Sequence, residues 1–357
     1  MTTARPNVLL ICDQRTRDSR IRPADTERLC SFADWEWFAS TADPSLETSE
    51  DAELIARLME RLLDVNGVVV AGGAPRITAD IIDRAPELRV IGDMGGDRFA
   101  ERIDLEAAWQ RGIRTVDTTN ATSYPVAEWA LGLILISLRN AGAHFRRMIA
   151  GNTTRMPHDE DPGYWHAELM GRRVGLIGCG HIGRRLIKFL RPFETDTRVY
   201  DPYLPQGMAE ALGVLQTSLD NVLSQSEVIV SLAPLTPRTH RMIGQRELDL
   251  IPSGAVLVNV SRGAIIDPDA LIARLRRGDV VAALDVFDPE SIPADSEILQ
   301  LPNVFLTPHI SGATATSVSC MFTLMVDELD RFFHGHQTYF DLTPLSQANR
   351  QGKTLDH

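Results

Sequence analysis

Four residues with acid–base or anion-binding side chains lie at or just after the ends of hydrophobic, strand-like segments in the second half of the chain. They are Arg262, Asp285, Glu290 and His309. The carboxyl ends of parallel strands meet at one edge of an open α/β sheet, and ligands bind at that edge. A lone histidine at a strand end is usually a packing residue. The case for a chemical role of His309 therefore depends on the other three residues at the same edge.

The set suits the reduction of a 2-oxo acid to a 2-hydroxy acid. Histidine can donate a proton to the forming alkoxide, because its pKa ordinarily lies near neutrality. A neighbouring carboxylate such as Glu290 favours the imidazolium and fixes its tautomer. The planar guanidinium of Arg262 matches a substrate carboxylate and can polarise the adjacent carbonyl. The remaining requirement is a hydride donor.

A glycine motif indicates where a dinucleotide would bind. The sequence "VGLIGCGHIGRR", residues 174–185, contains Gly178-x-Gly180-x-x-Gly183 between an apolar strand-like run and a helical pattern. In this context the first glycine makes a tight turn, the second lets the backbone approach a pyrophosphate, and the third lets the helix pack on the strand. The helix N-terminus adds N–H groups and a positive dipole end for the phosphates.

Asp201 ends the next strand-like run, eighteen residues after Gly183. A carboxylate at this place accepts hydrogen bonds from the ribose hydroxyls and repels a 2′-phosphate, so the sequence predicts NAD rather than NADP. The alternative is a glycine-rich turn with an unrelated surface aspartate. The complete strand–turn–helix context favours the cofactor site.

The elements that position these residues alternate between β-branched runs and helical patterns, which is typical of parallel α/β sheets. In the first part of the chain, the predicted strands and helices alternate within one small α/β unit. The predicted strands are 7–12, 67–72, 88–94 and 113–118, and the predicted helices are 51–65, 77–84 and 104–111.

A single long helix is predicted over 125–149, opening at Pro125, and a loop over 151–165. A second, longer strand series follows the loop. Its predicted strands are 173–177, 197–200, 227–232, 255–260, 280–285 and 303–307. A closing helix is predicted over 316–335, with a polar, loose tail beyond it.

The length of 357 residues is typical of two domains. Hydrophobic content of 44% and charged content of 24% are ordinary for a globular protein. The net charge of −12 argues against nucleic acid or an anionic membrane surface as a partner. The longest apolar run, residues 129–138, is too short to cross a bilayer, and the N-terminal apolar stretch is too short for a signal peptide.

The cysteines are scattered and show no paired spacing, which predicts reduced thiols in a cytoplasm rather than disulfides or a zinc site. They are Cys12, Cys30, Cys179 and Cys320. His334 and His336 lack nearby cysteines or a closing ligand set, so no metal site is expected.

Five motifs together resemble the D-isomer-specific 2-hydroxyacid dehydrogenase family, in its phosphoglycerate and glycerate dehydrogenase-like branch. The resemblance runs from about residue 52 to 335. The motifs are "VGLIGCGHIGRR", "LAPLTPRTHRMIG", "VLVNVSRGAIID", "AALDVFDPE" and "LPNVFLTPHISGAT". The resemblance implies an NAD-dependent enzyme that interconverts a 2-oxo acid and the (R)-2-hydroxy acid.

By this resemblance Arg262 binds the substrate's carboxylate and carbonyl, Glu290 orients and charges His309, and His309 is the acid/base. The backbone of Gly95 and Gly96 would hold the substrate carboxylate. The glycine loop, Asp201 and the later strand ends would bind NAD, with Asp285 holding the nicotinamide carboxamide. The implied cofactor residues are Gly178, Gly180, His181, Ile182, Gly183, Asp201, Ala233, Pro234, Thr239, Val260, Ser261, Asp285 and Gly312.

The implied fold is α/β with two Rossmann-like domains. An NAD-binding doubly wound parallel sheet is inserted into a smaller flavodoxin-like substrate domain, with the active site in the cleft between them. The expected boundaries are 1–122 and 313–340 for the substrate domain, 123–312 for the NAD-binding domain and 341–357 for the tail. The helix at 125–149 is expected to form a homodimer.

The sequence departs from the family pattern near the expected substrate site. The loop at 93–102 is long and charged, and it is either a solvated insertion or a place where Arg98 or Arg102 meets a second anionic group. Relatives acting on phosphoglycerate commonly carry arginines where residues 71–73 read Ala-Gly-Gly, although Arg76 is close. Tyr124 either reaches the cleft or packs at the helix entry.

Two alternatives to an ordinary 2-hydroxyacid dehydrogenase follow. One is a dehydrogenase of an atypical acid, such as a phosphonate or another dianion, which the charged loop would suit. The other is an NAD-responsive regulatory protein that binds protein partners. The complete set of Arg262, Glu290 and His309 disfavours the second alternative, as does the lack of a tryptophan shortly after His309.

Overall fold

The computed structural model describes residues 5–40, 52–95, 102–154, 157, 160 and 168–353. The chain divides into two compact units. The first comprises Met1–Thr122 and Thr314–Ala348, and the second comprises Ser123–Ala313 and Asn349–His357. Two segments distant in sequence therefore build the first unit, and Ser123–Ala313 of the second unit lies between them in sequence. The returning segment of the first unit extends to Ala348.

The first unit contains a five-stranded parallel sheet, in the order β2-β1-β3-β4-β5. This is the flavodoxin-like strand order. Its strands are β1 (Asn7–Cys12), β2 (Asp34–Ala39), β3 (Gly67–Val70), β4 (Val90–Asp93) and β5 (Arg114–Asp117). The sequence predicted four of them and missed β2, a half-exposed edge strand whose register pairs Val8 with Trp35.

Both faces of this sheet are buried, since alternate residues of β1 belong to different cores. Leu9 and Ile11 pack with the helices α3 (Ala52–Arg61), α4 (Ala79–Asp83) and α5 (Leu105–Gln110). Val8 and Leu10 pack with α2 (Pro23–Phe32) and α13 (Ala315–Phe333). A further short helix, α1 (Gln14–Arg20), contacts α13. The near-continuous apolar strands reflect this two-sided burial.

The segment after residue 335 is not a loose tail, contrary to the sequence-based expectation. Asp341 forms an antiparallel bridge with Val116 of β5, and Leu342 is buried in the core. The carboxylate of Glu328, on α13, accepts hydrogen bonds from the N–H groups of Tyr339 and Phe340 at 2.8 and 3.0 Å. Burial raises the pKa of Glu328, although these two donors act in the opposite direction. A short helix, α14 (Pro344–Arg350), follows.

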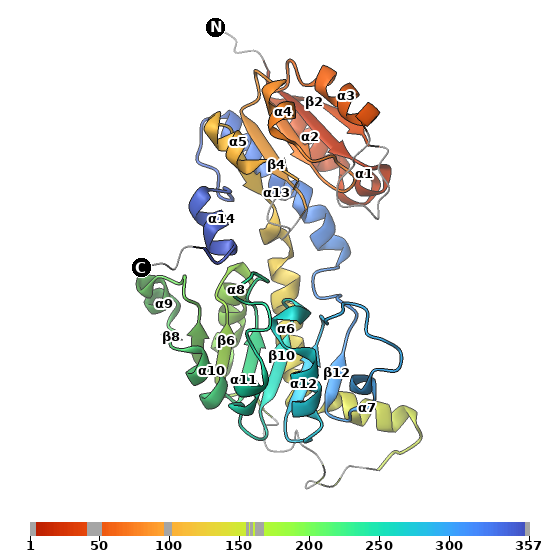
Figure 1. Ribbon diagram of the computed structural model, residues 1–357, viewed down its shortest axis with the longest axis vertical. Helices are drawn as coiled ribbons and strands as arrows, with labels where there is room; N and C mark the ends of the chain where they lie inside the picture. The colour runs from red at the N-terminus through yellow and green to blue at the C-terminus, as the bar shows by residue number, and fades with distance from the viewer. Residues whose placement is uncertain are drawn as a thin grey trace. The chain divides into compact units, whose positions relative to one another are not determined.

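The second unit contains a seven-stranded parallel sheet, in the order β12-β11-β10-β9-β6-β7-β8 (Figure 1). Its strand order reverses between β6 and β9, as in dinucleotide-binding folds. The strands are β6 (Arg173–Ile177), β7 (Asp196–Tyr200), β8 (Leu215–Gln216), β9 (Val228–Ser231), β10 (Val256–Asn259), β11 (Val281–Leu284) and β12 (Val304–Leu306). Six of these strands were predicted within one or two residues, and β8 was not.

Helices cover both faces of this larger sheet. The helices α6 (Ser123–Ser137) and α8 (His181–Leu190) contribute to one apolar core. The opposite core contains α10 (Leu219–Gln225), α11 (Gln245–Asp249) and α12 (Pro268–Leu275). The remaining elements are short: α9 (Gln206–Leu212), η1 (Thr119–Thr122), η3 (Arg191–Phe193), η4 (Gly263–Ile265) and η5 (Glu297–Gln300). The α/β class and the two-domain Rossmann architecture predicted from the sequence are confirmed.

The prediction of a single helix over residues 125–149 is wrong. Two helices occupy this range, α6 and α7 (Ala141–Ile149), and their axes differ by 70°. Asn140 separates them with a left-handed φ of 44°, a conformation that asparagine tolerates better than most residues. Leu133, on α6, is 0% exposed and belongs to the core.

Among the described residues, no single helix has the length and apolarity to span a membrane. Only the bent pair of Thr119–Ser137 and Ala141–Ile149 meets both criteria when joined.

Candidate active site

The strand order of the larger sheet explains why the four candidate residues come together. The strands β10, β11 and β12 are neighbours, and Arg262, Asp285 and His309 each follow one of them. Glu290 lies on the same loop as Asp285. All four therefore occupy the carboxyl edge of one end of the sheet, as the sequence predicted.

His309 and Glu290 form a close pair. The Nδ1 atom of His309 lies 2.6 Å from Oε1 of Glu290, a hydrogen bond in which the ring donates when Nδ1 carries the proton. The two side chains are 46% and 53% exposed, so the pair is open to a substrate. The carboxylate fixes the ring orientation through Nδ1, which leaves Nε2 for proton exchange.

Asp285 anchors the turn that carries His309. Its backbone carbonyl accepts from the N–H of His309 at 2.8 Å. Its buried carboxylate accepts from Thr307 Oγ1 at 2.5 Å and from the N–H groups of Ile310 and Ser311, both at 3.0 Å. His309 itself has a left-handed φ of 52°. Four hydrogen bonds to one residue thus hold a histidine in a backbone conformation it would otherwise avoid.

Asn259 shapes the turn that presents Arg262, a role that sequence analysis missed. Its Oδ1 accepts from Ser261 N at 3.1 Å and from Ser261 Oγ at 2.8 Å, and its Nδ2 donates to the carbonyl of Arg262 at 3.1 Å. The signal was available, because a buried strand that ends in asparagine needs partners for the amide. Burial lowers the pKa of Arg262, and the negative charge of Glu290 opposes this shift. The two side chains therefore interact electrostatically.

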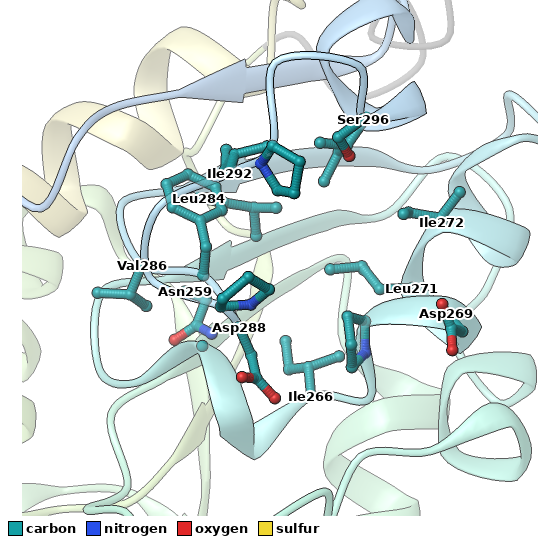
Figure 2. Close-up of a pocket in the computed structure, with 16 residues that line it drawn as sticks. Asn259, Ile266, Asp269, Leu271, Ile272, Leu284, Val286, Asp288, Ile292 and Ser296 are labelled. Carbon is teal, nitrogen blue, oxygen red and sulfur yellow. The ribbon is translucent and has the colours of Figure 1, made fainter.

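The turn of Arg262 and the loop of Glu290 touch through their backbones. A side chain at Gly263 would overlap the carbonyl group of Phe287, so only glycine permits this contact. The two segments also enclose a pocket of about 240 Å³, in which Leu271, Ile272 and Ile292 supply much of the apolar wall (Figure 2). The segments that carry Arg262 and Glu290 are therefore parts of one packed unit.

The three glycines of the dinucleotide motif differ in what surrounds them. Gly178 has a φ of 100°, and a Cβ there would lie 2.8 Å from the backbone nitrogen of Ala233. A Cβ on Gly183 would lie 2.9 Å from the carbonyl oxygen of Gly178, which marks close helix–strand packing. A Cβ on Gly180 meets no protein atom within 4 Å. Gly180, the N-cap of α8, therefore borders open space, where a phosphate group fits.

Asp201 lies beside the glycine loop at the end of β7. Its Oδ2 accepts from the N–H of Cys179 at 2.7 Å, and its Oδ1 accepts from the N–H of Tyr203 at 2.9 Å. Each oxygen retains a lone pair for a further donor. Burial raises the pKa of Cys179 to about 11, so its thiol stays protonated near neutral pH.

The remaining predicted cofactor residues occupy the same edge of the sheet. Ala233 and Pro234 follow β9, and Val260 and Ser261 follow β10, so they lie between the glycine loop and the His309 turn in strand order. Thr239 donates its hydroxyl to the carbonyl of Pro234 at 2.6 Å and closes that loop. His181 and Ile182 open α8, and Gly312 follows the Asp285-bound residues of the His309 turn.

The expected substrate loop is only partly described, since Gly96 and Arg98 lie outside the described residues. The N–H of Gly95 donates to Oδ1 of Asp93 at 2.5 Å, so an internal partner already uses it. Arg102 is 7% exposed, and therefore it is not the solvated side chain that one interpretation of the loop expected.

Tyr124 lies in the first turn of α6. Its exposed ring stacks under the guanidinium of Arg185, which lies 3.7 Å from the ring centroid.

In the part of the chain that the structure describes, no group of three or more His, Cys, Asp or Glu side chains is arranged to hold a metal ion.

A model of the family described as "D-isomer specific 2-hydroxyacid dehydrogenase, NAD binding domain" matches residues 131–311. A glyoxylate/hydroxypyruvate reductase B from Yersinia pseudotuberculosis is 32% identical over 296 residues, which are 82% of this chain and 87% of that protein. The chain belongs to the D-isomer-specific 2-hydroxyacid dehydrogenase family.

Two further relatives extend the comparison of this D-2-hydroxyacid dehydrogenase family member. The D-3-phosphoglycerate dehydrogenase of Methanocaldococcus jannaschii is 34% identical over 280 residues, which are 78% of this chain but only 52% of that protein. The chain thus spans about half the length of that relative. The crystal structure of a phosphoglycerate oxidoreductase from Rhizobium etli superimposes with a TM-score of 0.79 at 26% identity, covering 95% of this chain and 98% of that one.

The residues of this family member fit the NAD that its matched domain is described as binding. Gly178, Gly180, Gly183 and Asp201 all lie within residues 131–311. The open space at Gly180 would receive the pyrophosphate, and the lone pairs of Asp201 would receive the ribose hydroxyls.

Replacing the glycines one at a time should separate cofactor binding from folding. We expect Gly180→Ala to leave the thermal midpoint of the cofactor-free protein unchanged but to weaken NADH binding by about tenfold or more, equivalent to ~1.4 kcal/mol. Gly178→Ala should lower the midpoint itself, because its Cβ meets backbone atoms in a left-handed conformation. NADH fluorescence titration and differential scanning calorimetry measure the two effects. Unchanged NADH affinity in Gly180→Ala would argue against binding of the cofactor pyrophosphate at the glycine motif.

Proposed function

We propose that the protein is an NAD-dependent oxidoreductase that interconverts a 2-oxo acid and its (R)-2-hydroxy acid. One observation carries the proposal. The His309–Glu290 pair, with 2.6 Å between Nδ1 and Oε1, shares one sheet edge with Arg262 and with a dinucleotide cradle. Bound NADH would supply the hydride for reduction of the substrate carbonyl. The (R) configuration rests on family membership.

The protein's own residues then have distinct tasks. Arg262 binds the substrate carboxylate and polarises the neighbouring carbonyl, and the charge of Glu290 opposes the effect of burial and so favours the charged guanidinium. His309 donates a proton from Nε2 to the forming alkoxide oxygen, and it accepts that proton back in the oxidative direction. Glu290 stabilises the imidazolium through Nδ1, so His309 is positioned and charged by the same contact.

A regulatory NAD-binding protein is the alternative from another functional class. Such a protein needs the cradle but gains nothing from a histidine held in a left-handed conformation by four hydrogen bonds to Asp285. Strain of this kind persists where the surrounding structure maintains a functional geometry. The geometry therefore supports an enzyme over a regulatory NAD-binding protein.

Removing the acid/base histidine should abolish turnover without abolishing cofactor binding. We expect His309→Ala to lower kcat for NADH oxidation by about 10²–10⁴-fold, the usual contribution of general acid catalysis, and Glu290→Gln to lower it less. The assay is a panel of 2-oxo acids, with NADH affinity measured by fluorescence. His334→Ala is a matched control, since that exposed histidine pairs with Asp330 at 2.7 Å. Full activity of His309→Ala would refute the assignment.

Asp201 underlies a preference for NAD over NADP. A 2′-phosphate at this place would face the carboxylate, so we expect NADPH to give a kcat/KM at least about tenfold below that of NADH. Asp201→Ala should lower the ratio of kcat/KM for NADH to kcat/KM for NADPH, because it reduces the efficiency with NADH. Steady-state kinetics with both cofactors measure the ratio, and equal use of NADPH by the wild type would contradict the proposal.

We also propose a homodimer, formed through the second half of the 125–149 segment. Leu133 cannot contribute because it is fully buried, whereas Phe145 and Ile149 of α7 are 65% and 70% exposed. Adjacent exposed apolar side chains on one helix are typical of an interface.

Charged residues on α7 should therefore reduce the size of the particle in solution. We expect Phe145→Glu combined with Ile149→Glu to sediment as a monomer, because burying two carboxylates in an apolar interface is unfavourable. Leu63→Glu places the same charge at an exposed leucine of the other unit and should leave the sedimentation coefficient unchanged. A wild-type monomer, or an unchanged coefficient in the double variant, would contradict this interface.

A cytoplasmic location is proposed from the cysteines, all four of which are free. Free thiols are typical of a reducing compartment. Cell fractionation would test this location, and recovery of the protein from an oxidising compartment would contradict it.

A further inference from the structure

Arg241 has a left-handed backbone conformation that the proposed chemistry does not explain. Its φ is 50°, close to the 52° of His309, and both residues lie in loops beyond the carboxyl ends of strands in the larger sheet. A left-handed φ is unfavourable for arginine, and such conformations persist where the surrounding structure imposes them, often at functional sites. The contacts of Arg241 therefore indicate what its conformation achieves.

The backbone of the Arg241 segment is joined to the turn that carries Arg262. The N–H of Arg241 donates to the carbonyl of Ala264 at 2.7 Å. Two residues later, Ile243 forms a parallel bridge with Ile266. The loop that follows β9 therefore runs beside the segment that follows β10, and backbone hydrogen bonds hold the two together.

The side chain of Arg241 extends this connection to the loop of Glu290. Its Nη1 donates to Oδ2 of Asp267 at 3.3 Å, and its Nη2 lies 3.9 Å from Oδ2 of Asp288. Asp267 caps α12 through its other oxygen, which accepts from the N–H of Ala270 at 3.0 Å. Asp288 lies two residues before Glu290, on the wall of the pocket shown in Figure 2. One guanidinium thus connects the segments that follow β9, β10 and β11.

Stabilisation of the fold does not account for an arginine at this position. The side chain of Arg241 is 49% exposed, and those of its partners Asp267 and Asp288 are 25% and 33% exposed. Ion pairs that are open to solvent contribute little to the free energy of unfolding. Glycine would adopt the same φ without strain. The distinctive effect of the arginine is therefore to restrain the segments that its guanidinium contacts.

We propose that Arg241 is a positioning residue that restrains the loop of Glu290 beside the turn of Arg262. The inference rests on the proposed function, because the loop affects turnover through the 2.6 Å contact between Glu290 and His309. Arg241 holds Asp288, and Asp288 limits the movement of Glu290 two residues further along the loop. Small displacements of a positioned acid–base group reduce the rate of reaction.

Substitutions at position 241 separate the side chain from the backbone conformation. Arg241→Gly removes both ion pairs and also relieves the left-handed strain, so the loss of the pairs should not lower its thermal midpoint. Arg241→Lys keeps a cation beside the two carboxylates. Glu194→Gly is the matched control, because Glu194 has a φ of 52° in the same unit. It lies just before β7, at the opposite edge of the sheet from the site.

Steady-state kinetics use the 2-oxo acid that the wild type reduces most efficiently. We expect Arg241→Gly to lower kcat by about three- to fivefold, the effect of one exposed ion pair, with KM and NADH affinity little changed. Arg241→Lys should retain most of kcat. Glu194→Gly should have the kcat of the wild type, and circular dichroism and thermal midpoints verify that each variant folds.

Hydrogen exchange measures the restraint without turnover. Backbone amides of residues 286–291 should exchange faster in Arg241→Gly than in the wild type by a similar factor, because the loop opens more readily. Mass spectrometry of peptides from this loop measures the exchange, and Glu194→Gly should leave it unchanged.

A double variant distinguishes positioning through Glu290 from a general structural effect. If Arg241 acts through Glu290, Arg241→Gly combined with Glu290→Ala should be no slower than Glu290→Ala alone, because the group that Arg241 positions is already absent. Losses in kcat that multiply in the double variant would show that Arg241 acts by another route.

Two results would overturn the inference. One is multiplied losses in the double variant, and the other is unchanged exchange of residues 286–291 in folded Arg241→Gly. If no 2-oxo acid oxidises NADH, the proposed function fails, and the effect on turnover fails with it. Faster exchange in Arg241→Gly would in that case still establish that Arg241 restrains the loop, so the two failures are distinguishable.

Discussion

The buried carboxylate of Asp285 is the constraint on which the rest of the site depends. Its oxygens and its backbone carbonyl accept four hydrogen bonds from residues 307–311. Those bonds hold His309 in a left-handed conformation, and in this conformation its Nδ1 lies 2.6 Å from Oε1 of Glu290. A buried carboxylate that accepts several hydrogen bonds is costly to disturb, so these bonds stabilise the geometry of the turn. Cofactor contacts predicted for Asp285 would act on an already rigid group.

Close backbone contacts extend this rigidity from the His309 turn to the cofactor cradle. Gly263 lies against Phe287, and Gly178 lies against Ala233, with no room for a side chain in either place. Each contact joins a loop that follows one strand to a loop that follows the adjacent strand. The segments that carry Arg262, Glu290 and the glycine motif are thereby held by close glycine contacts at the edge of a single sheet, which is how preorganised sites keep their geometry.

Much of this arrangement could be predicted because buried parallel strands leave a strong pattern in the sequence. The apolar runs and the polar residues that end them identified Arg262, Glu290 and His309 and their common edge. Features that depend on tertiary contacts were missed. Strand β2 is a half-exposed edge, and the break at Asn140 is hidden within continuous apolar composition. The structural tasks of Asn259 and Gly263 likewise depend on partners distant in sequence or on backbone geometry.

The insertion of one unit within the other has a consequence for biosynthesis. The sheet of the first unit is covered on one face by α13 and extended at β5 by the segment around Asp341, and both lie after the inserted unit in sequence. On the ribosome, β1 to β5 emerge long before these covering residues do. The inserted unit can bury its core while the N-terminal sheet still exposes Val8, Leu10 and Val116, so the second part of the chain to emerge is the first able to fold.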